Sequence, residues 1–239
     1  VIEAFEVPLL PVLGRAMGQV CARIHRERGV DLRLGEMVTK VRETSAGVVV
    51  TTRSGAQIEG DTLVIGIGIE PNVELAQRSG LSVSNGVLVD QYCRTDIPNV
   101  LAAGDVANHY HPLFRERMRV EHFDNANRQA AAAAKNILGQ EVPYDDPHWF
   151  WSDQYDLNLQ YAGHARGWDE LVVRGSVDDL DFCAFYLRAG LIRAAFAVDR
   201  GADVVAAKEL IIGGVRVPGD VLADEDLDLA ELVEAREPA

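Results

Sequence analysis

A glycine and a carboxylate stand together after a short apolar run in the stretch TDIPNVLAAGDVANH, residues 95–109. Glycine and aspartate are common where a strand turns, so Gly104 and Asp105 could simply form a turn. The pair could also serve a ligand, because a glycine lets the ligand approach the backbone and a carboxylate accepts its hydroxyl protons. Taken alone, the two residues leave both interpretations open.

A second group of residues could hold a dinucleotide. Glu3 closes an apolar strand, and in a dinucleotide-binding βαβ unit an acid at such a strand end accepts hydrogen bonds from the adenosine ribose. It would favour NADH, because a carboxylate repels the 2'-phosphate of NADPH. Gly66 and Gly68 lie near the end of an apolar run, where open α/β sheets bind ligands. The alternatives are a solvated surface glutamate and glycines that permit close packing of a strand on a helix.

The elements around these residues predict part of a nucleotide-binding α/β domain. An amphipathic helix is predicted over residues 14–28, and residues 37–44 and 47–55 form a predicted hairpin. The continuous apolar run at 63–69 is typical of a strand buried on both faces of a parallel sheet. The apolar stripe of the helix consists of Met17, Val20, Cys21 and Ile24.

The middle of the chain predicts further α/β structure around Gly104 and Asp105. A short helix is predicted at 73–79, with strands at 86–90 and 100–103. A longer helix is predicted to start at an Asp124 cap and to end at Gly139. Beyond residue 145 we expect a separate α+β unit on an antiparallel sheet, with β-type runs at 157–163, 170–175, 181–190 and 191–199 and a helix near 202–211.

Composition limits the class of protein. The 239 residues are 48% hydrophobic and carry a net charge of −14, which gives no long-range attraction for nucleic acid or anionic membranes. Cys21, Cys93 and Cys183 are far apart, which favours buried thiols in a reducing cytoplasm, and no metal site is predicted. No apolar run approaches the roughly 18 residues of a spanning helix, and no signal peptide is evident.

Three motifs together are far more specific than any of them alone. They are T-x-x-P-x-V-L-A-x-G-D at 95–105, RVEHFDNA at 119–126 and WFWSDQ at 149–154. With them the sequence resembles the putidaredoxin reductase-like family of FAD-dependent NADH:ferredoxin reductases and the related apoptosis-inducing factor, over nearly the whole chain. The resemblance implies Rossmann-like portions of an NAD domain (1–70) and an FAD domain (71–145), followed by an α+β C-terminal interface domain (146–239).

The resemblance implies roles for the residues of these motifs. Asp105, next to Gly104, would accept hydrogen bonds from the ribityl hydroxyls of FAD. Phe123 would lie beside the isoalloxazine, where the family often has a Trp side chain. Glu121 and His122 would lie where nicotinamide meets flavin, although His122 could instead be a core histidine.

Trp151 would reach the same region from the C-terminal domain, and core packing of both Trp149 and Trp151 is the alternative. We expect one of these two rings to face the flavin and the other to face the opposite side. Glu3, Gly66 and Gly68 would contact NADH. The cluster Arg115, Arg117 and Arg119 is expected to be a solvated arginine face, with a docking patch for an acidic ferredoxin as the less common alternative.

The implied reaction passes a hydride from NADH to FAD and then single electrons to a [2Fe-2S] ferredoxin that serves a monooxygenase or dioxygenase. The alternatives are a related flavoenzyme with another acceptor, such as a disulfide, and a truncated, non-catalytic interaction module. The chain opens without Met, in what looks like the end of a strand. We therefore expect a missing upstream segment, an inactive isolated chain with little or no affinity for FAD, and possible self-association through exposed strand edges.

Overall fold

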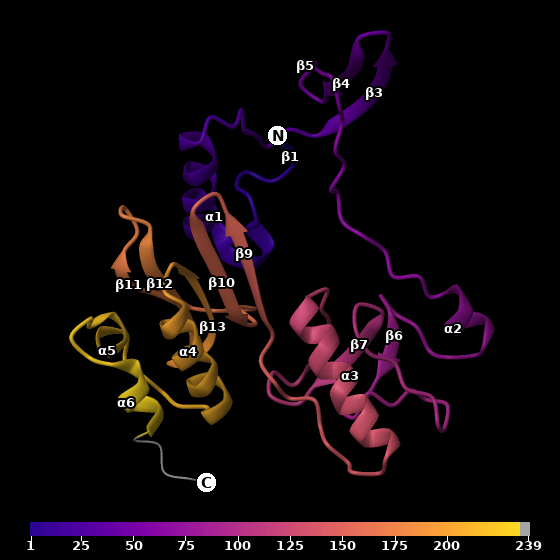
Figure 1. Cartoon of the computed structure of the whole chain (residues 1–239), viewed down its shortest axis with the longest axis vertical. Coiled ribbons are helices and arrows are strands. Elements are labelled where there is room, and N and C mark those ends of the chain that lie inside the picture. The colour runs from indigo at the N-terminus through magenta and orange to yellow at the C-terminus, as the bar shows by residue number, and fades with distance from the viewer. Residues whose placement is uncertain (235–239) are drawn as a thin grey trace. The chain divides into compact units, whose positions relative to one another are not determined.

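The computed structural model describes residues 1–234, and the chain divides into two compact units between Gly68 and Ile69 (Figure 1). In the N-terminal unit, strand β1 (Ile2–Glu3) pairs in parallel with β2 (Arg33–Leu34), and helix α1 (Leu10–Glu27) connects them. The helix kinks at Gly14, which has φ 71°. Its predicted apolar stripe is confirmed, because Met17, Val20, Cys21 and Ile24 are all buried.

The rest of the N-terminal unit is an antiparallel meander. It consists of β3 (Val38–Thr44), β4 (Gly47–Thr52) and β5 (Gln57–Gly60), which confirms the predicted hairpin. The predicted strand at 63–69 is wrong. Among the described residues no strand pairs with this segment, and its side chains are exposed, Val64 by 89% and Ile67 by 91%. An apolar run becomes a buried strand only where neighbouring strands satisfy its backbone.

The second unit begins with helix α2 (Glu74–Arg78) and a small sheet, which confirm the predicted helix at 73–79 and the strand at 86–90. Strand β7 (Ala107–His111) lies between β6 (Val87–Val89), to which it is parallel, and β8 (Glu116–Arg119), to which it is antiparallel. The predicted strand at 100–103 is wrong, because only Leu101 of this segment pairs, in an isolated bridge with Arg94 across the turn at 97–100.

Helix α3 (Phe123–Ile137) follows β8 and corresponds to the helix predicted at 124–139, with both ends shifted by one or two residues. Its N-cap is His122, so Asp124 lies in the first turn and is not the cap. There Asp124 makes a 2.9 Å ion pair with Arg128, one turn further along the helix. The small residues Ala132 and Ala133 form its buried side and pack against Cys93 and Tyr144.

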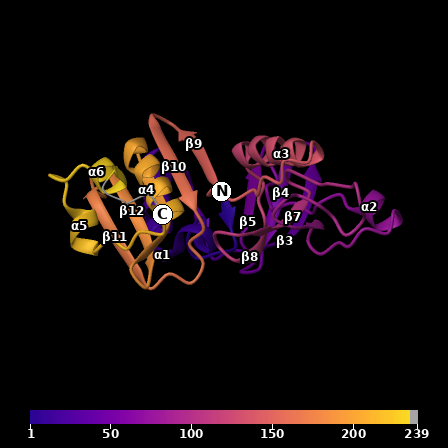
Figure 2. The same cartoon turned by 90° about the horizontal axis from the view of Figure 1, so that it is seen from below.

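The C-terminal part is an antiparallel five-stranded sheet covered by helices, as predicted (Figure 2). The strands are ordered β11-β12-β13-β10-β9, and α4 packs on β13 and β10. Their bounds are β9 Trp149–Gln154, β10 Leu157–Gly163, β11 Glu170–Ser176, β12 Asp181–Arg188, β13 Leu191–Val198, α4 Gly201–Gly213, α5 Gly219–Ala223 and α6 Leu229–Glu234.

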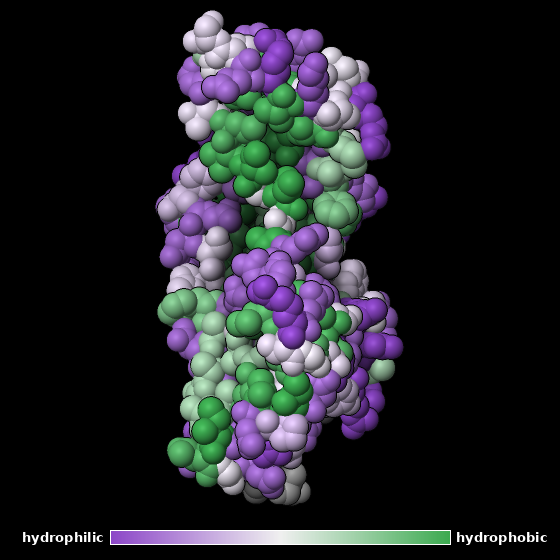
Figure 3. Space-filling model, turned by 90° about the vertical axis from the view of Figure 1, so that its right-hand side faces the viewer, coloured by the Kyte–Doolittle hydropathy of each residue, from purple (hydrophilic) through white to green (hydrophobic). Residues whose placement is uncertain are grey.

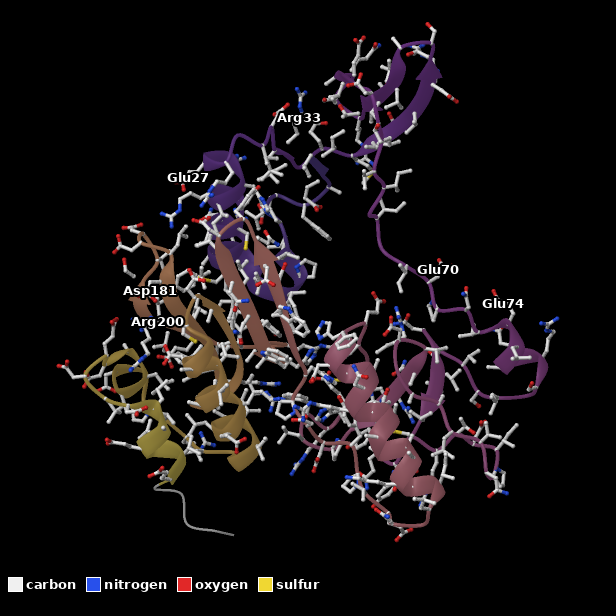
Figure 4. The ribbon with its side chains drawn as sticks, viewed as in Figure 1. Glu27, Arg33, Glu70, Glu74, Asp181 and Arg200 are labelled. Atoms are coloured by element: carbon white, nitrogen blue, oxygen red, sulfur yellow. The ribbon has the colours of Figure 1, made fainter. Side chains whose placement is uncertain are left out.

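The core of this sheet is fully enclosed, with Phe185, Ala195 and Leu210 at zero exposure. At its edge Arg200 and Asp181 point toward each other and form a 2.8 Å ion pair (Figure 4). The boundary predicted at 145/146 stays a prediction, and the last five residues of the predicted acidic tail lie outside the described residues. No helix in the described part of the chain is long and apolar enough to cross a membrane.

Candidate functional site

The Gly104–Asp105 turn is held against the start of α3. Gly104 has φ 78°, and its N–H donates to Oε1 of the fully buried Gln129 at 2.7 Å. Arg119 donates to the Asp105 carbonyl at 3.1 Å from β8. A Cβ added at Gly104 would lie 3.6 Å from the Cβ of Ala126, so the backbone passes close to the helix. The turn is therefore fixed from two sides, while Asp105 itself is exposed.

The start of α3 presents unused backbone donors beside this turn. His122, the N-cap, has extended backbone angles, and no described side chain caps the helix. The first N–H groups of a helix have no intrahelical acceptor and favour negatively charged or hydrogen-bond-accepting ligands. The start of this 15-residue helix thus adds hydrogen-bond donors to the acceptor supplied by Asp105.

Exposed aromatic rings meet at the same end of α3. Phe123 is 74% exposed and Trp151 is 42% exposed, and their rings meet edge to face at a centroid distance of 6.3 Å. Trp151 also stacks on Trp149 at 5.0 Å with an interplanar angle of 27°. The expectation that the two indoles face opposite sides is wrong, because residues two apart on a strand share one face. Together the three rings form an aromatic shelf.

Glu121 and His122 lie between the shelf and β8. Glu121 makes a 2.7 Å ion pair with Arg119, whose side chain is almost completely buried. The His122 ring packs on Phe150 at 4.6 Å, and its buried Nδ1 has no hydrogen-bond partner among the described residues. Burial lowers the pKa of His122, and the carboxylates of Glu121 and Asp105 oppose this shift. The imidazole is therefore neutral at neutral pH and can act as an acceptor or donor toward a ligand.

The residues predicted to bind NADH lie in the other unit. Oε1 of Glu3 accepts a 2.8 Å hydrogen bond from the backbone N–H of Phe5, at the end of β1. Gly66 and Gly68 lie in the exposed segment after β5, where no described atom comes within 4 Å of an added Cβ. The NADH roles of these three residues stay predictions.

An apolar hollow of about 710 Å³ lies in the same N-terminal unit. Side chains of β1, of the meander and of residues 62–67 line it, among them Ile2, Val50 and Ile65. Figure 3 shows apolar residues gathered around a hollow in the upper part of the view, where this unit lies. The hollow and the exposed segment at 63–69 are thus parts of one apolar surface.

The arginine cluster is only partly a solvated face. Arg119 is almost completely buried against Glu121 and Asn85. Arg117 donates to the carbonyls of Val89 and Asn108, at 2.8 and 3.1 Å. Only Arg115, in the β7–β8 turn, is exposed without such a described bond. The prediction of a solvated face is therefore wrong for Arg119, whereas Arg115 and Arg117 are exposed.

The cysteines do not fit a redox-active pair. All three are free and buried. Burial raises the pKa of Cys21 to about 11 and that of Cys93 to about 12, and it also raises the pKa of Cys183. A thiolate is the reactive form, so these thiols are inert at neutral pH. The described residues thus contain no dithiol pair that would serve the alternative of a flavoenzyme with a disulfide acceptor.

A histidine cluster was missed by the sequence analysis. His109 and His111 on β7 and His148 just before β9 offer ring nitrogens that all lie within 4.8 Å of one another. All three are buried, and burial lowers their pKa values, that of His109 to about 3. An unsatisfied buried polar group costs about 1–3 kcal/mol, so the cluster requires an explanation. The available signal was the H-x-H spacing, which places two rings on one face of a strand.

Two family models match the chain. Residues 1–130 match the pyridine nucleotide-disulphide oxidoreductase family, and residues 149–233 match the reductase C-terminal family. The first match spans more than half of the chain, and the second covers the antiparallel sheet and its helices.

Relatives and solved structures agree with these matches. The chain is 41% identical, over 98% of its length, to the 5,5'-dehydrodivanillate O-demethylase ferredoxin reductase subunit of Sphingobium sp. strain SYK-6. The ferredoxin reductase for the CYP199A2 system from Rhodopseudomonas palustris superposes with a TM-score of 0.92 at 34% identity, again over 98% of this chain.

The covalent putidaredoxin reductase–putidaredoxin complex gives a TM-score of 0.92 at 33% identity, over 98% of this chain. This chain spans 58% of the length of the first two proteins and 57% of the third. The resemblance to ferredoxin reductases and the mixed α/β fold class are therefore confirmed, and the chain belongs to the pyridine nucleotide-disulphide oxidoreductase family.

Proposed function

We propose that the protein containing this chain is a cytoplasmic, FAD-dependent oxidoreductase that takes a hydride from NADH and passes single electrons to a [2Fe-2S] ferredoxin. One observation carries the proposal: the exposed rings of Phe123 and Trp151 meet at the uncapped start of α3, where the Gly104–Asp105 turn lies. An apolar shelf beside a few convergent polar groups is typical of a cofactor site. The names of the relatives support the same assignment.

The residues fit a flavin dinucleotide. Gly104 adopts the positive φ that favours glycine where the backbone passes α3, Asp105 presents acceptors for polyol hydroxyls, and Phe123 and Trp151 offer apolar faces to a planar ring. The unpartnered Nδ1 of His122 is a polar atom still available to such a ring or to nicotinamide. When bound, FAD would supply the redox chemistry that couples a hydride donor to a one-electron acceptor.

The protein's own contribution is positioning. Arg119 holds both the Asp105 carbonyl and the Glu121 carboxylate, so the turn and the segment before α3 keep a fixed spacing. Trp149 stacks on Trp151, and its Nε1 donates to Oε1 of Gln160 at 3.2 Å, which holds the indole in place. A preformed site of this kind holds two reacting rings together and excludes water without requiring a general acid or base. Glu3, Gly66 and Gly68 are proposed to bind NADH.

The test compares Asp105→Ala with Asp61→Ala, which removes another exposed carboxylate, this one from the N-terminal unit. Both are made in the product of the complete gene, and the dissociation constant for FAD is measured by flavin fluorescence. Loss of a charge-assisted acceptor is expected to weaken FAD binding about tenfold or more, with no change for Asp61→Ala. Equal affinities of the wild type and Asp105→Ala for FAD would contradict a role of Asp105 in FAD binding.

The electron acceptor is tested separately. NADH oxidation by the flavin-loaded protein is measured with a [2Fe-2S] ferredoxin and with ferricyanide. Reduction of ferricyanide alone would contradict the proposed partner but not the flavin site. The isolated 239-residue chain is expected to be inactive and to bind FAD weakly, and stoichiometric flavin in it would contradict that expectation.

Arg115 remains the candidate for ferredoxin docking, since it is exposed and, unlike the exposed Arg117, its side chain makes no described hydrogen bond. Arg115→Glu is expected to slow ferredoxin reduction at low ionic strength and to leave ferricyanide reduction unchanged, because a small dye needs no docking patch. Equal loss of both activities would exclude a docking role.

A further inference from the structure

We propose that His109, His111 and His148 form a binding site for one divalent transition-metal ion of the kind that prefers imidazole, with Zn²⁺ as the representative ion. Two of the ligands come from β7, where residues two apart share a face, and the third precedes β9. Each ring is buried within the second unit, and the ring nitrogens converge within 4.8 Å.

The ring positions match a three-histidine site. The ring centroids of His109 and His111 are 5.5 Å apart, those of His109 and His148 5.3 Å, and those of His111 and His148 5.0 Å. Zn–N bonds of about 2.0–2.1 Å at tetrahedral angles place the centroids of ligating imidazoles about 5 Å apart. Small rotations of the rings are then enough to bring the nitrogens to ligand distance.

The hydrogen bonds of the rings leave the appropriate lone pairs unused. Nε2 of His111 lies 3.1 Å from the carbonyl oxygen of Asp146, which can only accept, so this nitrogen carries the proton. Nε2 of His148 lies 2.8 Å from Sδ of Met118, another acceptor. In both rings the Nδ1 lone pair is therefore free for a metal, in the arrangement by which metal-binding histidines are usually oriented.

His109 completes the set, because neither of its ring nitrogens makes a hydrogen bond of good geometry with a described residue, although the backbone of Met118 partly opposes the fall of its pKa. Nδ1 of His111 and Nδ1 of His148 are also buried without partners among the described residues. A packing role does not require this, since phenylalanine or leucine would fill the same space beside Phe114 and Tyr144 without stranded polar atoms. A bound cation satisfies one nitrogen of each ring at once.

The surroundings suit a cation that stabilises structure. The carboxylates of Asp145 and Asp146 act electrostatically on His111 from the segment that precedes His148. Asp146 is already paired with Arg128 and Lys208, so Asp145 is the carboxylate that would offset part of the charge of the ion. The ion would join the strand that follows Asp105 to the start of the strand that carries Trp151. Three protein ligands leave a fourth position, which water would occupy. Because the ion would link these two strands in the folded state, its binding would stabilise the second unit.

The test uses the 239-residue chain purified without a histidine tag, stripped with a chelator and titrated with Zn²⁺ or Co²⁺ alone. We expect one ion per chain, a Co²⁺ absorption spectrum typical of tetrahedral coordination, and a higher melting temperature that chelation reverses. His109→Gln and His148→Gln are expected to lose at least tenfold in affinity. The matched control His164→Gln, which removes a histidine of the same unit outside the cluster, is expected to bind as the wild type does.

X-ray absorption of the Zn²⁺-loaded wild-type chain keeps the proposal testable if a variant fails to fold. The expected first shell contains three imidazole nitrogens at about 2.0–2.1 Å. Failure of the stripped wild-type chain to bind Zn²⁺ or Co²⁺ would overturn the proposal. Undiminished binding by His109→Gln and His148→Gln, or a first shell without imidazole, would overturn it as well.

Discussion

Two apolar β-type stretches of this chain have opposite outcomes. Residues 63–69 form no strand and are exposed throughout, whereas β12 and β13 form a hairpin whose inner residues are completely buried. Both stretches are rich in residues that favour strands. The difference is that β13 has β12 on one side and β10 on the other, while no described strand lies beside 63–69. Apolar composition thus gives the capacity to form a buried strand, and pairing decides whether that capacity is used.

The largest expected effect that tests this comparison is the truncation of Phe185. This side chain on β12 has zero exposure, so Phe185→Ala leaves a cavity and is expected to cost about 3–5 kcal/mol of unfolding free energy. Tryptophan fluorescence during urea unfolding measures it, because Trp149, Trp151 and Trp168 all lie in the second unit.

The matched truncation in the other stretch is Ile67→Ala. Since Ile67 is 91% exposed, the free energy of unfolding is expected to change by less than about 0.5 kcal/mol. Urea unfolding followed by circular dichroism measures it. A loss comparable to that of Phe185→Ala would show that the 63–69 segment is packed, and the comparison would fail.

A second pair of variants compares buried and exposed cations. Arg174 on β11 is buried, donates to the carbonyls of Leu222, Asp224 and Leu227, and lies 3.5 Å from the Asp203 carboxylate. Burial raises the pKa of Asp203, and Arg174 opposes that shift. Arg174→Met strands these acceptors and is expected to cost about 3 kcal/mol in the fluorescence-detected unfolding of the second unit.

The exposed counterpart is Arg33, whose ion pair with Asp31 spans 3.0 Å at the surface of the N-terminal unit (Figure 4). Arg33→Met is expected to cost less than about 1 kcal/mol, because water solvates both partners. Circular dichroism during urea unfolding measures it. Equal losses of unfolding free energy in Arg174→Met and Arg33→Met would mean that burial does not determine how much these arginines contribute to stability.

Local periodicity predicted much of the fold. The amphipathic stripe of α1, the β3–β4 hairpin and the antiparallel C-terminal sheet could all be read from the chain, because their partners are close in sequence. The strand predicted at 63–69 failed because its neighbours cannot be inferred from its own residues. The strand predicted at 100–103 failed because the chain turns before it, at 97–100, and after it, at Gly104, which leaves only the isolated bridge of Leu101 with Arg94.

The candidate site was predictable only in part, for a similar reason. The resemblance implied that Asp105 and Trp151 serve one site, and the structure brings Phe123, the first residue of α3, into contact with Trp151. The inward orientation of Arg119 could not be predicted, because its acceptors come from Asp105, Glu121 and a distant turn. The histidine cluster needed the fold as well, since His148 is 37 residues from His111 in a chain with several other histidines.

The smallest expected effect on stability, with a large effect on association, comes from charging the exposed segment. Val64→Lys combined with Ile67→Lys is expected to leave the free energy of unfolding within about 0.5 kcal/mol of wild type, since both side chains already face solvent. An exposed, flat apolar segment with an unpaired backbone promotes pairing with other chains, and lysines prevent it. Sedimentation velocity over a range of concentrations should therefore show less self-association. Loss of structure in the double variant would instead mean that 63–69 pairs within the chain, which is the outcome that the buried hairpin β12–β13 exemplifies.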